Sequence, residues 1–201
     1  MVIHGFVTAG GRSSRMGTDK AWLEIDGRPM IQRAVDALNQ VTSTVSIIAN
    51  GAEYARLGLP VLADLNSGIG PLEAIRVALA SSRAPFVLLV ACDLPFVTAE
   101  FLNFLLDRVE DHQALAPLNP DGQLEPLCAI YSTEALKHVT ELIRSGERKV
   151  SRLLDCLRTR LIPFEDFSKL PGAERFFFNV NTPEDYSRVG ETSRGPGHPS
   201  S

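Results

Sequence analysis

A glycine-rich, cationic loop follows the first apolar run of the chain and constrains the fold more than any other segment. The run Ile3–Val7 is typical of a buried strand, and residues 8–20 then hold three glycines and three cations. Glycine lets successive backbone N–H groups point at an anion, and Arg15 and Lys20 add full charges that suit phosphate. The segment therefore predicts a cradle for a nucleoside triphosphate; the alternative is a flexible loop after an edge strand.

Two better-known phosphate loops do not fit this segment. The G-x-x-x-x-G-K-[ST] loop is absent, because Lys20 follows an aspartate rather than a glycine. The G-x-G-x-x-G dinucleotide motif is absent, because Gly10 and Gly11 are adjacent.

The composition excludes several classes of protein. The 201 residues carry a net charge of −4, which gives no reason to expect a nucleic acid or an anionic membrane as partner. No apolar run approaches the length of a membrane span, and no charged segment precedes the first apolar one, so we expect a cytoplasmic protein. The three cysteines and four histidines are widely spaced, which predicts buried thiols and no zinc site.

Strands and helices are predicted to alternate along the chain, which is typical of an α/β domain with a largely parallel sheet. Phe86–Ala91 is continuously apolar and is therefore predicted to be a central strand covered on both faces. Residues 1–190 are predicted to form one domain, and residues 191–201, rich in Gly, Pro, Ser and Thr, a disordered tail. The other strands predicted near the glycine-rich loop are Thr44–Ala49 and Pro60–Ala63.

Local signals predict further elements. Pro71 and Thr98 are suited to helix starts, and Thr182-Pro183-Glu184-Asp185 matches a capping box with proline at the first helical position. Leu124–Tyr131 and Phe176–Val180 are predicted to be strands.

Polar side chains are predicted to gather at one edge of the sheet. The glycine-rich loop, Asn50, Asp64 and Asp93 each follow a predicted strand. In open parallel sheets, ligands bind beyond the carboxyl ends of the strands at a topological switch point. We therefore expect these groups to meet in one crevice.

Each of these residues has a chemical use and an ordinary alternative. Asp93 follows the most apolar strand, where a carboxylate suits Mg²⁺ together with substrate phosphates; the alternative is a hydrogen-bonded turn residue. The Asp64 carboxylate only accepts hydrogen bonds, so it suits contact with a sugar hydroxyl or a base N–H. The alternative is a solvated loop residue. Asn50 suits contact with base or ribose, or forms the turn before Gly51.

The predicted phosphate loop and Mg²⁺ ligand together indicate the type of reaction. A triphosphate with Mg²⁺ and no Walker loop favours nucleotidyl transfer, an in-line displacement that needs positioning and charge neutralisation rather than a protein nucleophile. Arg15 and Lys20 would neutralise charge on the departing phosphate oxygens. Asn179 and Asn181 flank Val180, and strand alternation predicts that both lie on one face; simple turn chemistry is the alternative.

These motifs resemble those of a known family. Thr8-Ala9-Gly10-Gly11…Arg15-Met16-Gly17…Lys20 resembles the L-A-G-G-x-x-x-R-M-G-x-x-K signature of the molybdenum cofactor guanylyltransferases. The resemblance covers about Gly5 to Val189. The segments that match the remaining signatures in order are Asp64…Gly70-Pro71-Leu72, Cys92-Asp93-Leu94-Pro95-Phe96 and Asn179-Val180-Asn181-Thr182-Pro183-Glu184. Two more segments look like those of the family, Glu125-Pro126-Leu127-Cys128-Ala129 and Ser145-Gly146-Glu147-Arg148-Lys149-Val150.

The resemblance implies a Rossmann-like, three-layer nucleotidyltransferase fold with a mostly parallel mixed sheet. It implies transfer of GMP from GTP to the terminal phosphate of molybdopterin, with release of pyrophosphate, and transient contact with molybdenum-insertion proteins and the apoproteins of molybdoenzymes. It also assigns roles: nucleotide binding by Thr8, Ala9, Gly10, Gly11, Lys20, Asn50, Asp64 and Asp93; catalysis by Arg15, Lys20 and Asp93; Mg²⁺ binding by Asp93; and the pterin side by Asn179 and Asn181.

Two departures from the family pattern leave alternatives open. Thr8 replaces the usual leucine, and Glu73-Ala74 stands where a small residue and glycine are common, so a carboxylate could face the nucleotide and alter the base preference. The alternatives are a cytidylyltransferase acting on molybdopterin, a nucleotidyltransferase for another small phosphate acceptor, and a non-catalytic nucleotide-binding adaptor.

Overall fold

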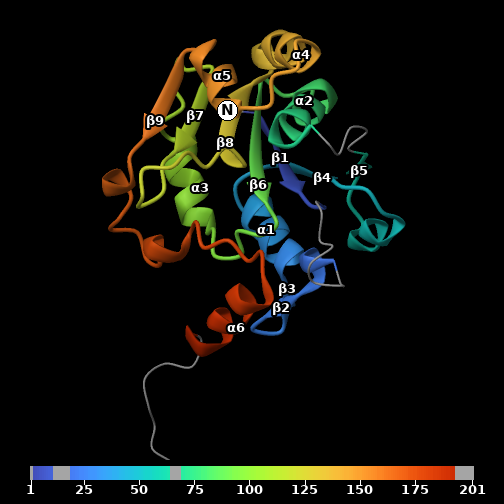
Figure 1. Ribbon diagram of the computed structural model, residues 1–201, viewed down its shortest axis with the longest axis vertical. Coiled ribbons are helices and arrows are strands. Elements are labelled where there is room, and N and C mark those ends of the chain that lie inside the picture. The colour runs from blue at the N-terminus through green and yellow to red at the C-terminus, as the bar shows by residue number, and fades with distance from the viewer. Residues whose placement is uncertain (1, 11–18, 64–68, 193–201) are drawn as a thin grey trace, which may run out of the picture.

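A seven-stranded sheet forms the centre of the molecule in the computed structural model, which describes residues 2–10, 19–63 and 69–192 (Figure 1). The strand order is β5-β4-β1-β6-β8-β7-β9. Its strands are β1 (Ile3–Thr8), β4 (Thr44–Ile48), β5 (Val61–Leu62), β6 (Phe86–Ala91), β7 (Ala114–Pro117), β8 (Cys128–Ser132) and β9 (Thr159–Ile162).

The sheet is mostly parallel, as predicted. Strand β1 pairs in parallel with β4 on one side and β6 on the other, β4 with β5, and β7 with β9. Strand β8 runs antiparallel to both of its neighbours, β6 and β7. The chain therefore leaves β1 in two directions across the sheet, which makes the carboxyl end of β1 a topological switch point.

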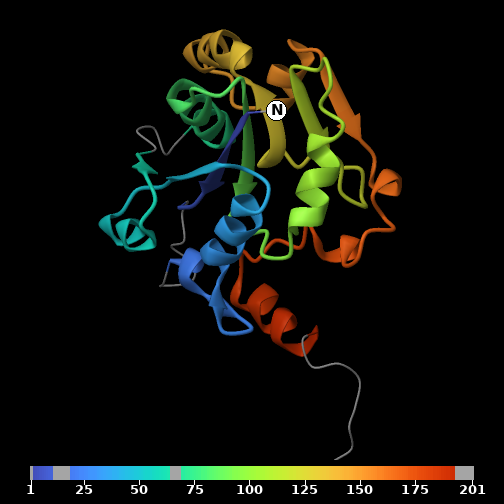
Figure 2. The ribbon, with the colours of Figure 1, turned by 180° about the vertical axis from the view of Figure 1, so that it is seen from behind.

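Helices cover both faces of the sheet and complete the three layers (Figures 1 and 2). Helices α1 (Met30–Asn39) and α3 (Ala99–Leu106) pack on the face that contains Val7. Helices α2 (Pro71–Ser81), α4 (Leu136–Arg144) and α5 (Val150–Asp155) pack on the face that contains Phe6. Because successive side chains of a strand point to opposite faces, Phe6 and Val7 belong to separate cores, and each is fully buried.

The predicted helix starts are confirmed. Pro71 is the first residue of α2, and the Thr98 hydroxyl caps α3 by accepting from the Phe101 backbone N–H at 3.2 Å. Helix α6 (Pro183–Thr192) begins with a reciprocal capping box: Asp185 N–H donates to the Thr182 hydroxyl, and the Asp185 carboxylate accepts from Thr182 N–H, at 3.1 and 2.9 Å.

Two predicted strands are wrong, in whole or in part. Residues 176–180 form turns and irregular chain, because Phe176 packs its ring against Phe101 instead of joining a sheet. The strand predicted over Leu124–Tyr131 begins only at Cys128, since Pro126 has no N–H to donate to a neighbouring strand.

A small hairpin and a satellite core extend the domain at the end of the sheet where β6 finishes (Figure 1). Strands β2 (Glu24–Ile25) and β3 (Arg28–Pro29) form the hairpin, and α6 is joined to it by the Tyr186 hydroxyl, which donates to the Glu24 carbonyl at 2.7 Å. In the described ranges, no helix is both long and apolar enough to span a membrane. The prediction of buried thiols holds for two cysteines and is wrong for Cys156, which is exposed.

Candidate active site

The carboxyl ends of three parallel strands meet at the start of the glycine-rich loop. The Ala9 N–H donates to the Ile48 carbonyl of β4, and the Thr8 carbonyl accepts from the Cys92 N–H just after β6, each at 2.9 Å. Gly10 has a φ of +88°, and a side chain there would lie 4.0 Å from the Asn50 nitrogen. The structure thus brings Thr8, Ala9, Gly10 and Asn50 together, and the conformation of Gly10 explains the glycine at this position.

A charged cluster stands at this edge. The Lys20 ammonium donates to Asp93 Oδ2 at 2.6 Å and to Asn181 Oδ1 at 2.8 Å. The side chains of Lys20 and Asp93 are 16% and 19% exposed, so the pair is sheltered yet open to a ligand. Lys20 begins the short 3₁₀ helix η2 (Lys20–Trp22), Asp93 follows β6 and Asn181 precedes α6, so three distant segments converge.

The backbone around Asp93 is fixed from two sides. The Asp93 carbonyl accepts from the Val180 N–H at 3.1 Å, which also places Asn181 beside the carboxylate. Arg33 of α1 donates from Nε to the Pro95 carbonyl at 2.9 Å. The segment from Asp93 to Pro95 is therefore held by contacts with both α1 and the segment before α6.

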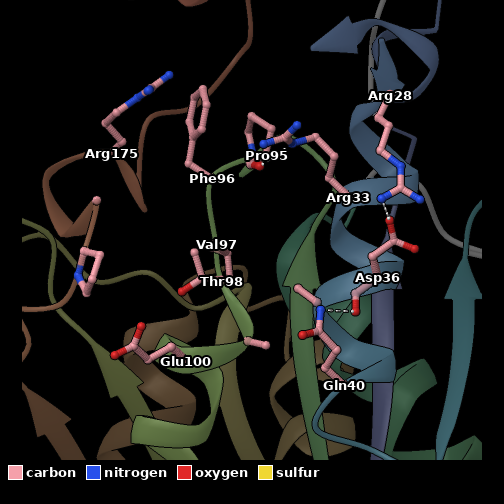
Figure 3. Close-up of a pocket in the computed structure, with 14 residues that line it drawn as sticks. Arg28, Arg33, Asp36, Gln40, Pro95, Phe96, Val97, Thr98, Glu100 and Arg175 are labelled. Carbon is pink, nitrogen blue, oxygen red and sulfur yellow. Dashed lines mark hydrogen bonds and ion pairs between the residues drawn. The ribbon is translucent and has the colours of Figure 1, made fainter. Parts of the chain in front are cut away.

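A cavity of about 570 Å³ lies behind this segment, between α1 and the start of α3 (Figure 3). Phe96 lines it, and the Arg175 guanidinium stacks 3.7 Å from the centre of the Phe96 ring. Lys20, Asp93 and Asn181 do not line this cavity. Two of its arginines, Arg33 and Arg175, contact Pro95 and Phe96, just after Asp93.

A second layer of hydrogen bonds supports Lys20. Asp19 accepts from the Ala21 N–H at 3.1 Å, which caps η2, and its other oxygen accepts from the Tyr54 hydroxyl. Tyr54 belongs to the 3₁₀ helix η3 (Ala52–Leu57) and is fully buried; burial and then the bond to Asp19 raise the pKa of its phenol. Sequence reasoning missed both residues, because a tyrosine 35 positions away carries no local signal of this contact.

Tyr54→Phe is expected to lower the free energy of unfolding by about 1 kcal/mol, because Asp19 loses a donor that water can partly replace. Urea denaturation measures the change. Tyr186→Phe removes a hydroxyl bonded to a backbone carbonyl at an exposed site and is the matched comparison, with a smaller effect expected. Equal losses in the two variants would contradict a special role for the Tyr54 bond.

The remaining predicted site residues either lie outside the described residues or are placed differently from the prediction. Gly11, Arg15 and Asp64 lie outside the described residues. The Asn179 amide donates to the Phe177 carbonyl at 3.4 Å, while Asn181 contacts Lys20. Strand alternation cannot place the two asparagines on one face, since no strand forms at these positions.

Glu73 does not present a bare carboxylate to the nucleotide side. It is fully buried in the first turn of α2, and its two oxygens accept from Nε and Nη2 of Arg76, each at 2.7 Å. The bidentate pair offsets the charge that the sequence departure adds.

The donor set of the cluster fits a hard divalent cation. Mg²⁺ favours one or two carboxylates with other oxygen ligands, water and substrate phosphates, and Asp93 and Asn181 offer such oxygens. In the part of the chain that the structure describes, no group of three or more His, Cys, Asp or Glu side chains is placed to hold a metal. The arrangement therefore suits an ion shared with a substrate better than a structural metal site.

The fold and this cluster define a class of protein. Three layers around a mostly parallel sheet, the start of a glycine-rich segment at its switch point, and a lysine, a carboxylate and an amide at the same edge are features of a nucleotidyltransferase. A cytidylyltransferase structure from Thermus thermophilus, for 2-C-methyl-D-erythritol 4-phosphate, has the same fold: its TM-score is 0.69 at 16% identity, over 96% of this chain and 100% of that one.

The chain belongs to the MobA-like NTP transferase family, whose sequence profile matches residues 5–161. A probable molybdenum cofactor guanylyltransferase of Pelotomaculum thermopropionicum is 39% identical over 90% of this chain and 88% of its own length. The structure of molybdopterin-guanine dinucleotide biosynthesis protein A from Archaeoglobus fulgidus has a TM-score of 0.79 and 26% identity, and the match covers 94% of this chain and 98% of that one. The family predicted from the motifs is confirmed.

Proposed function

We propose that this protein is a molybdenum cofactor guanylyltransferase, which transfers GMP from GTP to the terminal phosphate of molybdopterin. The observation that carries the proposal is the contact of Lys20 with both Asp93 and Asn181 at the carboxyl edge of the sheet. The names of the relatives support the choice of GTP and molybdopterin.

The reaction is a single displacement at phosphorus. An oxygen of the molybdopterin phosphate attacks the α-phosphorus of GTP, and the bond from that phosphorus to the oxygen bridging to the β-phosphate breaks. Pyrophosphate leaves with that oxygen and the electron pair. The protein supplies orientation and charge neutralisation, and no side chain forms a covalent intermediate.

We assign the roles of the chain's own residues accordingly. Thr8, Ala9, Gly10 and Gly11 present backbone groups to the nucleotide, and Asn50 and Asp64 contact the nucleoside. Lys20 and Arg15 neutralise the phosphates. Asn179 and Asn181 lie toward the pterin, with Asn181 reaching back to Lys20.

Asp93, with Asn181 beside it, is the residue that would hold Mg²⁺. Bound there, the ion would neutralise charge on the triphosphate. The protein is also proposed to contact molybdenum-insertion proteins and molybdoenzyme apoproteins transiently, when it receives its substrate and passes on its product.

Calorimetric titration with GTP, CTP and ATP, each with and without Mg²⁺, tests the nucleotide. We expect GTP to bind at least about tenfold more tightly than the other two, which corresponds to about 1.4 kcal/mol. Release of pyrophosphate on addition of molybdopterin then tests the reaction. Tighter binding of CTP would make the protein a cytidylyltransferase, and binding without pyrophosphate release would favour a nucleotide-binding adaptor.

A further inference from the structure

A half-buried carboxyl, Glu125, lies next to the end of β6 and takes no part in the cluster described above. The Ala91 N–H at the end of β6 donates to the Leu127 carbonyl at 2.7 Å, so the segment that leads into β8 runs beside Asp93. Burial raises the pKa of Glu125 to about 7, the bond from Asn119 acts against this rise, and the Asp93 charge adds to it. Glu125 therefore lies close enough to Asp93 to feel its charge, on the other side of β6.

The local chain holds this carboxyl rigidly. Glu125 N–H donates to the Pro117 carbonyl at 3.0 Å, and its carbonyl accepts from the Cys128 N–H at 3.1 Å. The Asn119 amide donates to Glu125 Oε1 at 3.0 Å, while its own oxygen accepts from the Asp121 and Gln123 N–H groups. Among the described residues, no hydrogen bond reaches Oε2, so one oxygen is fixed and the other is available.

The sheet divides the crevice into two halves at β6. Gly10 and Lys20 follow β1 and Asn50 follows β4, on one side of β6 in the strand order. Asn119 and Glu125 lie between β7 and β8, on the other side. In an in-line displacement the attacking group enters opposite the leaving group. If the β1 side holds the triphosphate, an attacking phosphate can reach the α-phosphorus, opposite the leaving group, from the β8 side.

We propose that Glu125 binds the acceptor substrate, through hydrogen bonding of its free Oε2 atom to the phosphate-bearing end of that molecule. The proposal rests on the proposed function, since it needs a phosphate acceptor. A carboxyl whose pKa is raised to about 7 is protonated in a large fraction of molecules at neutral pH, and its protonated form donates an O–H to a phosphate oxygen, whereas a carboxylate would repel it. The asparagine bond to Oε1 leaves the proton to Oε2.

Steady-state pyrophosphate release by the purified full chain, with Mg²⁺ and with GTP and molybdopterin varied in turn, separates the two substrates. Glu125→Ala is expected to raise the KM for molybdopterin about tenfold and to leave the KM for GTP within about twofold of the wild type. Glu125→Gln keeps a donor in place and is expected to stay close to the wild type for both. Glu134→Gln, at an exposed position two residues after β8, is the matched control with no change expected.

A merely structural role would raise both KM values together, so equal changes in Glu125→Ala would overturn the proposal, as would an unchanged KM for molybdopterin. A Gln variant as impaired as the Ala variant would overturn the donor role. If the Ala variant does not fold, Glu125→Asp withdraws the carboxyl by one methylene and the same selective rise is expected. A wild-type protein that transfers no GMP overturns the proposed function itself, and with it the acceptor role of Glu125.

Discussion

Asp93→Asn is expected to fold as the wild type does and to lose at least about 100-fold in turnover. The amide has the same shape, and the Asp93 carbonyl that accepts from Val180 is unaffected. The variant nevertheless loses the negative charge that Lys20 contacts at 2.6 Å and that a divalent cation needs. Turnover is measured by pyrophosphate release and folding by thermal denaturation.

The same variant separates nucleotide binding from chemistry. GTP binding without Mg²⁺ is expected to be retained, while the gain in affinity that Mg²⁺ brings is lost. Asp155→Asn replaces an exposed carboxylate on α5 that forms an ion pair with the exposed Arg152, and it is expected to behave as the wild type. Near-native turnover in Asp93→Asn would remove the residue from the catalytic machinery.

Much of the fold follows from local sequence patterns. The continuously apolar run 86–91 predicts a central strand, and β6 has these bounds with parallel β1 on one side of it. Pro71, Thr98 and Thr182 predict helix starts because each satisfies or removes backbone donors within its own turn. Such features depend on residues no more than a few positions apart.

The errors arise where distant contacts decide the structure. An aromatic run such as 176–178 has the composition of a strand, but Phe176 and Phe177 pack against Phe101, 75 or more residues earlier in the chain. The reversed direction of β8 likewise has no local sign, since apolar alternation is the same for parallel and antiparallel pairing.

The candidate site also contains residues that local patterns predict and residues that only distant contacts place. The placement of Asp93 and Asn50 at the ends of strands could be predicted, because the carboxyl ends of parallel strands share one edge. The bond between Lys20 and Asn181 joins residues 161 positions apart, and the bond from Tyr54 of η3 to Asp19 joins residues 35 positions apart. Neither is encoded in a local pattern, and the position of Glu125 depends on the unpredicted direction of β8.

Lys20→Ala is expected to weaken GTP binding about tenfold to 100-fold and to leave guanosine binding nearly unchanged. The ammonium is sheltered beside Asp93, so its bond to a phosphate oxygen would be charge-assisted and poorly replaced by water. Guanosine has no phosphate to contact it. Calorimetric titration of both ligands, in the presence of Mg²⁺, measures the two affinities on the same protein.

The selectivity of the loss is what distinguishes a phosphate contact from a structural one. Lys20 also holds Asp93 and Asn181 together, so a purely structural role would loosen the whole edge and weaken GTP and guanosine binding alike. Lys137→Ala removes an exposed ammonium from α4, which packs on the opposite face of the sheet from α1, and it is expected to change neither affinity. A proportional loss for both ligands in Lys20→Ala would therefore assign the lysine to the scaffold rather than to the triphosphate.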